Sequence, residues 1–135
     1  MITATEYFAK PSSPAQRAAA DDLLARVIAL LIVAQAAGTY DNWINPHTGT
    51  RISGSKDGDG DGGFRTPGSK TGSMTSSHRD GRGIDIYDPL NRLDDWIIDS
   101  TLERFGLYRE APAHTPGWCH LQTRAPGSGR RTYQP

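Results

Sequence analysis

The sequence is poor in cysteine: Cys119 is the only one among 135 residues. No disulfide can therefore form within the chain. Any cross-link that stabilises the fold would have to be made by a metal ion. A single cysteine fits a reducing compartment without establishing one. We expect Cys119 to be an inert buried thiol, because it falls on the apolar side of a short alternating segment.

The sequence also lacks an excess of either charge, a long apolar run and a secretory signal. Fifteen basic and fifteen acidic residues cancel, so no net field would attract nucleic acid or anionic lipid. The longest apolar run, residues 27–37, is interrupted by Gln35 and is shorter than the about 20 residues that a membrane helix needs. Residues 1–10 have no basic region followed by an apolar core. We therefore predict no signal peptide, no membrane partner and no nucleic-acid partner.

A chain of 135 residues fits one domain, residues 1–135. We divide it into an N-terminal helix (13–38), a core that carries the chemistry (51–123) and an extended C-terminal tail (124–135). Ser13 and Pro14 form a helix start that Gln16 can close as a capping box, and Gly38 provides a stop.

A second helix is predicted to begin at Asp88-Pro89 and to end at Gly106. Two short segments, 83–87 and 118–122, alternate with period two and are predicted strands. If they pair, Asp85 and His120 come together on the polar face of the sheet. The predicted fold class is α+β, with a small antiparallel sheet packed against two main helices.

The segment from His78 to Asp85 carries the chemistry. A histidine on a turn and an aspartate on the following strand, with glycines between them, can converge on one cation. Zinc accepts nitrogen and carboxylate ligands, and three protein ligands leave a fourth position for water, whose pKa the metal lowers. By spacing alone, a turn with a surface acid is the commoner interpretation of such a pair.

The run Ser76-x-His78-x-x-Gly81-x-Gly83-x-Asp85 resembles the signature of the D-Ala-D-Ala carboxypeptidase-like zinc peptidases, with Gly83 where the family has alanine. The run from Gly117 to Leu121 resembles the strand that bears the family's third ligand. The similarity spans roughly residues 40–135 and is closest to small phage-encoded members. It implies a hedgehog/D-Ala-D-Ala peptidase-like fold with one Zn²⁺ held by His78, Asp85 and His120.

The same resemblance implies substrate-binding roles for Arg65, Ser76 and Trp118. Arg65 looks like the arginine with which the family holds a peptide or carboxylate group, and a guanidinium suits bidentate capture of a carboxylate. A solvated loop arginine is an equally weighted alternative. Trp118 is the tryptophan placed near enough to the predicted metal to touch a substrate.

The sequence departs from the family at the general base. The family places an acid three residues before the third ligand, and that position is Gly117. Glu110, expected on a loop, is a candidate base, although we favour a surface glutamate there. Asp80 and His114 are weaker candidates.

Two functions follow from these residues. The first is a phage-type zinc-dependent peptidoglycan peptidase, carboxypeptidase or endopeptidase, that hydrolyses cell-wall peptide bonds. The second is a non-catalytic phage virion or tail protein that keeps the fold, binds the wall and contacts other virion proteins. Either would act from a virion or, before lysis, from the host cytoplasm.

Two weaker signals are set aside. The acidic run 57–62 resembles the start of a calcium loop, but Gly68 stands where the bidentate glutamate belongs, so we favour an acidic loop without calcium. His47 is interpreted as a turn residue.

Overall fold

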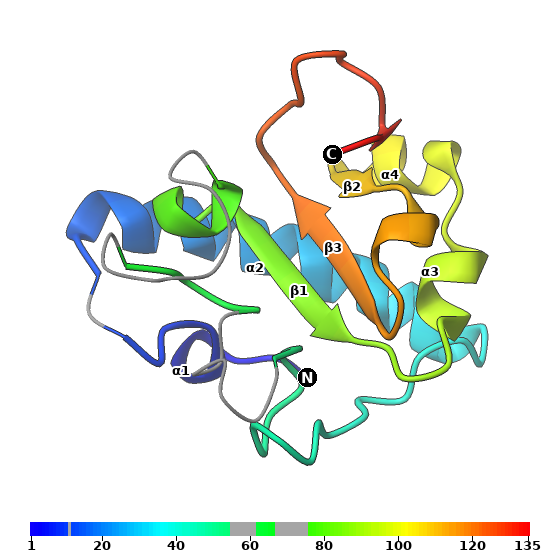
Figure 1. Cartoon of the computed structure of the whole chain (residues 1–135), viewed down its shortest axis with the longest axis horizontal. Helices are drawn as coiled ribbons and strands as arrows, with labels where there is room; N and C mark the ends of the chain where they lie inside the picture. The colour runs from blue at the N-terminus through cyan, green and yellow to red at the C-terminus, as the bar shows by residue number, and fades with distance from the viewer. Residues whose placement is uncertain (11, 55–61, 67–75) are drawn as a thin grey trace.

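The protein was analysed as a computed structural model that describes residues 1–10, 12–54, 62–66 and 76–135. The fold class is α+β, as predicted, with two main helices and a four-stranded mixed sheet (Figure 1). In chain order the elements are α1 (Ala4–Tyr7), α2 (Pro14–Ala36), the 3-10 helix η1 (Ser77–Asp80), β1 (Gly83–Tyr87), α3 (Arg92–Trp96), α4 (Asp99–Phe105), β2 (Tyr108–Glu110), the 3-10 helix η2 (Pro112–His114), β3 (Trp118–Gln122) and β4 (Thr132–Tyr133). In the described part of the chain, no helix has the length and apolarity to cross a membrane.

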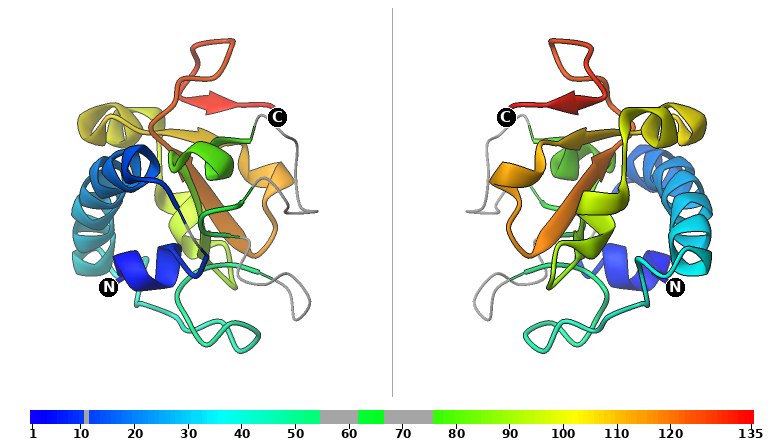
Figure 2. Two further views of the ribbon diagram at one scale, coloured as in Figure 1. Left: turned by 90° about the vertical axis from the view of Figure 1, so that its left-hand side faces the viewer. Right: turned by 90° about the vertical axis from the view of Figure 1, so that its right-hand side faces the viewer.

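Helix α2 begins and ends where the sequence predicts. The Ser13 side chain accepts the N–H of Gln16, and the Gln16 side chain accepts the N–H of Ser13, so the capping box is formed. The helix runs along one side of the sheet (Figures 1 and 2). Its buried residues are Ala20, Leu23, Leu24, Val27, Leu30, Leu31 and Ala34. Each buried leucine or valine contributes about 1.5–3 kcal/mol, so this stripe anchors the helix to the sheet.

The single helix predicted from Asp88 to Gly106 is wrong. The structure has two short helices, α3 and α4, separated by two extended residues, Ile97 at φ −67° and ψ 131° and Ile98 at φ −121° and ψ 167°. Ile97 is buried and Ile98 is exposed, so the break lets one isoleucine enter the core while the chain turns. The carboxylate of Asp88 accepts two backbone N–H groups at the start of α3, which explains the strong start signal in the sequence.

The sheet has the strand order β1-β3-β2-β4. Strand β3 pairs antiparallel with β1, as expected, and also with β2, which was not predicted as a strand from the sequence. Strand β4 pairs parallel with β2. The expectation of a purely antiparallel sheet is therefore wrong for its last strand. That strand comes from the tail 124–135, which was expected to be an extended surface segment; two residues, Thr132 and Tyr133, join the sheet.

The two faces of the sheet differ in chemistry because side chains alternate along each strand. Ile84, Ile86, Cys119 and Leu121 are fully buried in the core that α2 also lines. The other face is polar and carries the candidate site.

One row of polar side chains crosses all four strands on that face. Asp85 lies directly opposite His120, as predicted, and Glu110 lies opposite Tyr133. Arg109 pairs with Leu121, so the next step of the same register brings Glu110 opposite His120. The row therefore reads Asp85, His120, Glu110, Tyr133.

Candidate metal centre

Three short elements present the candidate ligands. His78 lies in η1, Asp85 in the middle of β1 and His120 in the middle of β3. The approach of η1 to β1 depends on Gly83, because a Cβ built there would lie 2.1 Å from the Ser77 hydroxyl oxygen. This contact gives a physical reason why this chain has glycine where the signature has alanine.

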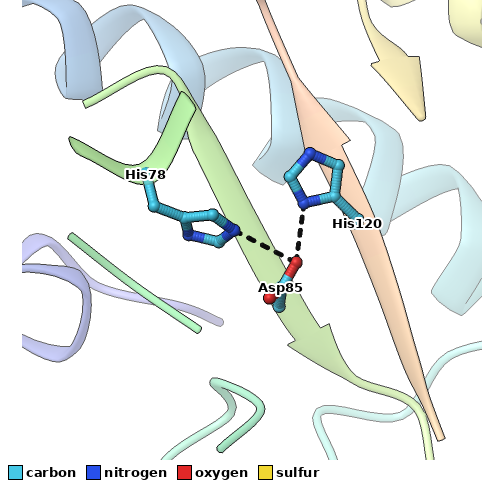
Figure 3. A group of neighbouring side chains, drawn as sticks. All are labelled: His78, Asp85 and His120. Carbon is cyan, nitrogen blue, oxygen red and sulfur yellow. Dashed lines mark hydrogen bonds and ion pairs between the residues drawn. The ribbon is translucent and has the colours of Figure 1, made fainter. Parts of the chain in front are cut away.

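The ligand atoms of these three residues converge (Figure 3). Oδ1 of Asp85 lies 2.7 Å from Nδ1 of His120 and 3.3 Å from Nε2 of His78. One ligand atom from each residue lies within 4.8 Å of the other two. The histidines are 2–3% exposed, and the Asp85 side chain is 13% exposed. This buried His-Asp-His group can hold one metal ion.

The remaining ring nitrogens are held by acceptors, which fixes both histidine tautomers. Nδ1 of His78 donates to the carbonyl oxygen of Gly63 at 2.9 Å, since a carbonyl can only accept. Nε2 of His120 donates to Oε1 of Gln122 at 2.7 Å. The Gln122 amide nitrogen donates to the carbonyl of Arg124, which sets the orientation of the amide.

In its neutral form, each histidine consequently turns a lone pair toward the Asp85 carboxylate. Three acceptor atoms that face one another repel unless a proton or a cation lies among them. Metal-bound histidines usually donate their other N–H to a carbonyl or a similar acceptor, as both do here. The donor set therefore fits a metal ion, and two nitrogens with one carboxylate oxygen suit zinc.

The pKa values follow from the same contacts. Burial alone would raise the pKa of Asp85. When no metal is bound, the charge of His78 and the hydrogen bonds that a ring N–H of each histidine then donates outweigh burial and hold that pKa well below its usual value. Burial alone would lower the pKa of His120, but the hydrogen bond and charge of Asp85 raise it above 6.5, with a smaller contribution from Glu110.

The candidate ligands form one wall of a cavity of about 600 Å³. The described residues that line it are Arg65, Ser76, Ser77, His78, Asp85, Glu110, Trp118, His120, Gln122, Arg124–Ser128 and Tyr133–Pro135. All the substrate-binding residues expected from the sequence, Arg65, Ser76 and Trp118, lie around this cavity.

Arg65 is 8% exposed, and its guanidinium lies beside the candidate metal group. One of its nitrogens is 3.4 Å from Oδ2 of Asp85, and another donates to the Ser76 hydroxyl at 3.4 Å. Ser76 also accepts the backbone N–H of His78 at 3.3 Å. Arg65 is therefore built into the site, and the alternative of a solvated loop arginine is wrong.

The expectation that Glu110 lies on a loop is wrong, because it is the last residue of β2. It is half-buried and lines the cavity, in the same row as His120. The other candidates lie elsewhere in the described structure: Asp80 pairs with Arg124 at 2.9 Å, and exposed His114 bonds to Gln134. Of the three acids and bases considered, Glu110 alone lines the metal cavity.

At the family's usual base position, Gly117 has a left-handed backbone, with φ +87°. Its N–H donates to the side chain of Asn91, and no described atom lies within 4 Å of a Cβ built on it. An acidic side chain there would meet no obstruction but would strain the backbone.

Sequence reasoning missed Gln122 and Tyr133. Gln122 Oε1 accepts three hydrogen bonds, from His120, from the Tyr133 hydroxyl at 2.6 Å and from the Ser77 hydroxyl at 3.3 Å. Gln122 is two residues after His120 on a strand, so alternation alone could have placed both on one face. Tyr133 had no comparable signal, because its position depends on the return of the tail to β2.

The remaining expectations concern isolated residues. Cys119 is buried, as expected, and burial raises the pKa of its thiol. His47 is exposed, and its backbone N–H donates to the Asn45 side chain in a turn, as predicted. The acidic run 57–62 falls outside the described residues except for Gly62.

Comparison of the chain with protein-family models, with curated proteins and with solved structures gave no match. The functional class therefore follows from the site itself: a buried His-Asp-His group, able to hold one metal ion, at the wall of a polar cavity.

Proposed function

We propose that this chain is a zinc-dependent peptidase of the D-Ala-D-Ala carboxypeptidase-like type, with the corresponding hedgehog-like fold, that hydrolyses peptide bonds of bacterial peptidoglycan. The observation that carries the proposal is the convergence of three acceptor atoms, from His78, Asp85 and His120, on one point of a cavity wall. A carboxylate and a guanidinium, from Glu110 and Arg65, line the same cavity. This combination suits metal-assisted amide hydrolysis.

A zinc ion held there would supply a Lewis acid with an open coordination position, which polarises a carbonyl and acidifies water. The chain supplies the remaining functions. Gly63 and Gln122 orient the two histidine rings, and Arg65 offers a planar donor group to a substrate carbonyl or carboxylate.

Glu110 is the residue that we assign to proton transfer. Hydrolysis of an amide adds hydroxide to the carbonyl carbon, breaks the C–N bond and returns one proton to the leaving nitrogen. A carboxylate that accepts the proton from water and passes it to nitrogen completes this balance. Glu110 comes from the strand next to His120 and faces the cavity, so it can replace the acid that is absent at Gly117.

The substrate class comes from the sequence resemblance, and the site is consistent with it. Of the residues that match the signature, Ser76, His78 and Asp85 line the cavity. Peptidoglycan stem peptides carry carboxylates and small side chains, which suit a polar cavity with an arginine in its wall. Action on the wall from a phage virion, or from the host cytoplasm at lysis, belongs to the same proposal.

A second candidate is a non-catalytic virion or tail protein that binds peptidoglycan peptide and uses the metal for stability. Gly117 at the usual base position favours this candidate. Metal binding adds directly to folding free energy, so a structural metal needs no base.

Digestion of purified peptidoglycan distinguishes the two. Zinc-loaded wild type is compared with His120→Ala and Glu110→Gln, and with Glu103→Gln, a matched control at an exposed glutamate of α4. We expect soluble peptides from wild type and the control, loss of metal and product in His120→Ala, and retained metal without product in Glu110→Gln. Sedimentation of metal-loaded wild type with intact peptidoglycan, without any product, would support the binding protein instead.

A further inference from the structure

We infer that the metal group lies inside a cleft that continues past it into a second cavity, so that the preferred substrate is an internal or cross-linking peptide bond rather than a terminal D-alanine. This inference rests on the proposed function and specifies its substrate. It starts from the space on the far side of Asp85.

The second cavity measures about 410 Å³, a size typical of ligand pockets. The described residues that line it are Asn45, His47, Ser53, Gly54, Gly62, Arg65, Asp85, Tyr87, Pro116, Gly117 and Trp118. Three of these, Arg65, Asp85 and Trp118, also line the first cavity. Because Asp85 is a candidate ligand, the two cavities adjoin at a residue that would hold the metal.

One wall of the second cavity is the loop from Asn45 to Gly54, which is fixed to the sheet. The buried Asn45 amide donates to the carbonyls of Ile52 and Gly54, at 3.3 and 2.9 Å. The N–H of Ser53 donates to the carbonyl of Asp85 at 2.8 Å. The loop is therefore held against Asp85 by a backbone hydrogen bond. The distance between this wall and the position where a metal would bind is fixed by that bond.

The floor is the continuation of the polar face of the sheet. Tyr87 lies opposite Trp118, two residues along each strand from the pair of Asp85 and His120. Residues two apart on a strand are about 6.6–6.8 Å apart. A substrate that extends past the metal in this direction would therefore reach an aromatic pair next.

The two cavities differ in charge. Arg124 and Glu110 line the first in addition to the shared Arg65, so it suits the charged part of a stem peptide. Among the described residues that line only the second, His47 and Tyr87 are the titratable side chains. The second cavity thus suits an uncharged stretch of peptide that packs on aromatic rings.

Room on both sides of the metal determines which bonds fit. Release of a terminal D-alanine leaves one small residue beyond the scissile bond and does not use a second cavity of this size. Cleavage of an internal bond places several residues on each side. The cleft therefore fits an endopeptidase.

The test compares two synthetic substrates with zinc-loaded wild type. One is an uncross-linked stem pentapeptide ending in D-Ala-D-Ala, and the other is a dimer of stem peptides joined by a D-Ala cross-link. We expect kcat/KM for cleavage within the dimer to exceed that for D-alanine release by at least about tenfold, measured by liquid chromatography with mass spectrometry. Equal or faster D-alanine release would overturn the inference and leave the proposed peptidase intact. Failure to hydrolyse either substrate would overturn both.

A variant that fills the second cavity separates its role from that of the metal. Ser53→Trp should lower kcat/KM for the dimer at least about tenfold with unchanged zinc content and little effect on D-alanine release. Ser100→Trp, at an exposed position of α4, is the matched control. His47→Ala is the milder change if Ser53→Trp does not fold, and it should raise KM for the dimer. Unchanged dimer cleavage by a folded Ser53→Trp, or unchanged KM in His47→Ala, would exclude the second cavity as a binding site.

Discussion

Asp85 and His120 lie directly opposite one another on antiparallel strands, with 2.7 Å between a carboxylate oxygen and a ring nitrogen. A slip of one residue in this register would move either side chain to the apolar face. The pairing of β1 with β3 and the assembly of the metal group are therefore one event. Metal binding and folding should be coupled in this protein.

The first prediction concerns that coupling. Zinc at about 100 times its Kd should stabilise wild type by about 2.7 kcal/mol, because the ligands converge only in the folded chain. His120→Ala should lose this stabilisation, measured as the zinc-dependent shift in the urea midpoint. His114→Ala, which removes an exposed histidine outside the group, should retain it. Equal shifts in the two variants would contradict the assignment of His120.

The second prediction concerns pH. The pKa of Asp85 is held low, so its stabilising charge is present above its unfolded pKa, about 3.9, and is lost as pH falls through the folded value. The pKa of His120 is raised, so protonated His120 stabilises the metal-free protein below about pH 6.5, and this contribution is lost as pH rises through the folded pKa.

Zinc needs His120 without its proton, so the stabilisation by zinc should grow over the same range. The difference in Tm between zinc-loaded and metal-free protein should widen from about pH 5 to about pH 8. Calorimetry at several pH values checks this expectation. A constant or shrinking difference would argue against His120 as a ligand.

The third prediction concerns Gln122 as a positioning residue. Gln122→Leu removes the acceptor that holds Nε2 of His120, so zinc affinity should fall about 10- to 100-fold. Tyr133→Phe removes one donor to the same oxygen and should have a smaller effect of the same sign. Competition with a chelator of known affinity measures both. Gln35→Leu, an exposed glutamine on α2, is the control and should bind zinc as wild type does.

The fourth prediction concerns a buried ion pair behind the site. Arg109 donates to fully buried Asp94 at 3.0 Å, and the Thr115 hydroxyl donates to the same carboxylate at 2.7 Å. Arg109→Met leaves that carboxylate without its cation and should cost about 3–5 kcal/mol in unfolding free energy. Asp22→Ala, which removes an exposed helical pair, should cost at most about 0.5 kcal/mol. Similar losses in urea unfolding would contradict this account.

Local signals in the sequence were enough to predict the main helix, α2, and the pairing of the two central strands, β1 and β3. The capping box at Ser13 and the stop at Gly38 give the limits of α2, and alternation in 83–87 and 118–122 gives the register of Asp85 with His120. These features depend on residues close in sequence or on a period of two. The group of His78, Asp85 and His120 was anticipated from the resemblance of the run Ser76 to Asp85 to the zinc-peptidase signature, because spacing alone favoured a turn with a surface acid.

The remaining features depend on packing between distant segments. Nothing local distinguishes a continuous helix from one broken at Ile97, because the break is set by the entry of that side chain into the core. The parallel pairing of β4 joins Tyr133 to Glu110 across 23 residues, and no pattern in the tail indicates it. Glu110 was placed on a loop because a three-residue strand is too short to show alternation.

The return of the tail has a practical consequence for work with this protein. Tyr133, Gln134 and Pro135 line the metal cavity, so whatever is fused after Pro135 leaves from its rim. A polyhistidine tag at that end would bring competing imidazoles to the candidate metal ligands and could fill the cavity. The same tag placed before Met1 begins in a segment that does not line the cavity, and assays of metal content or hydrolysis should use that arrangement.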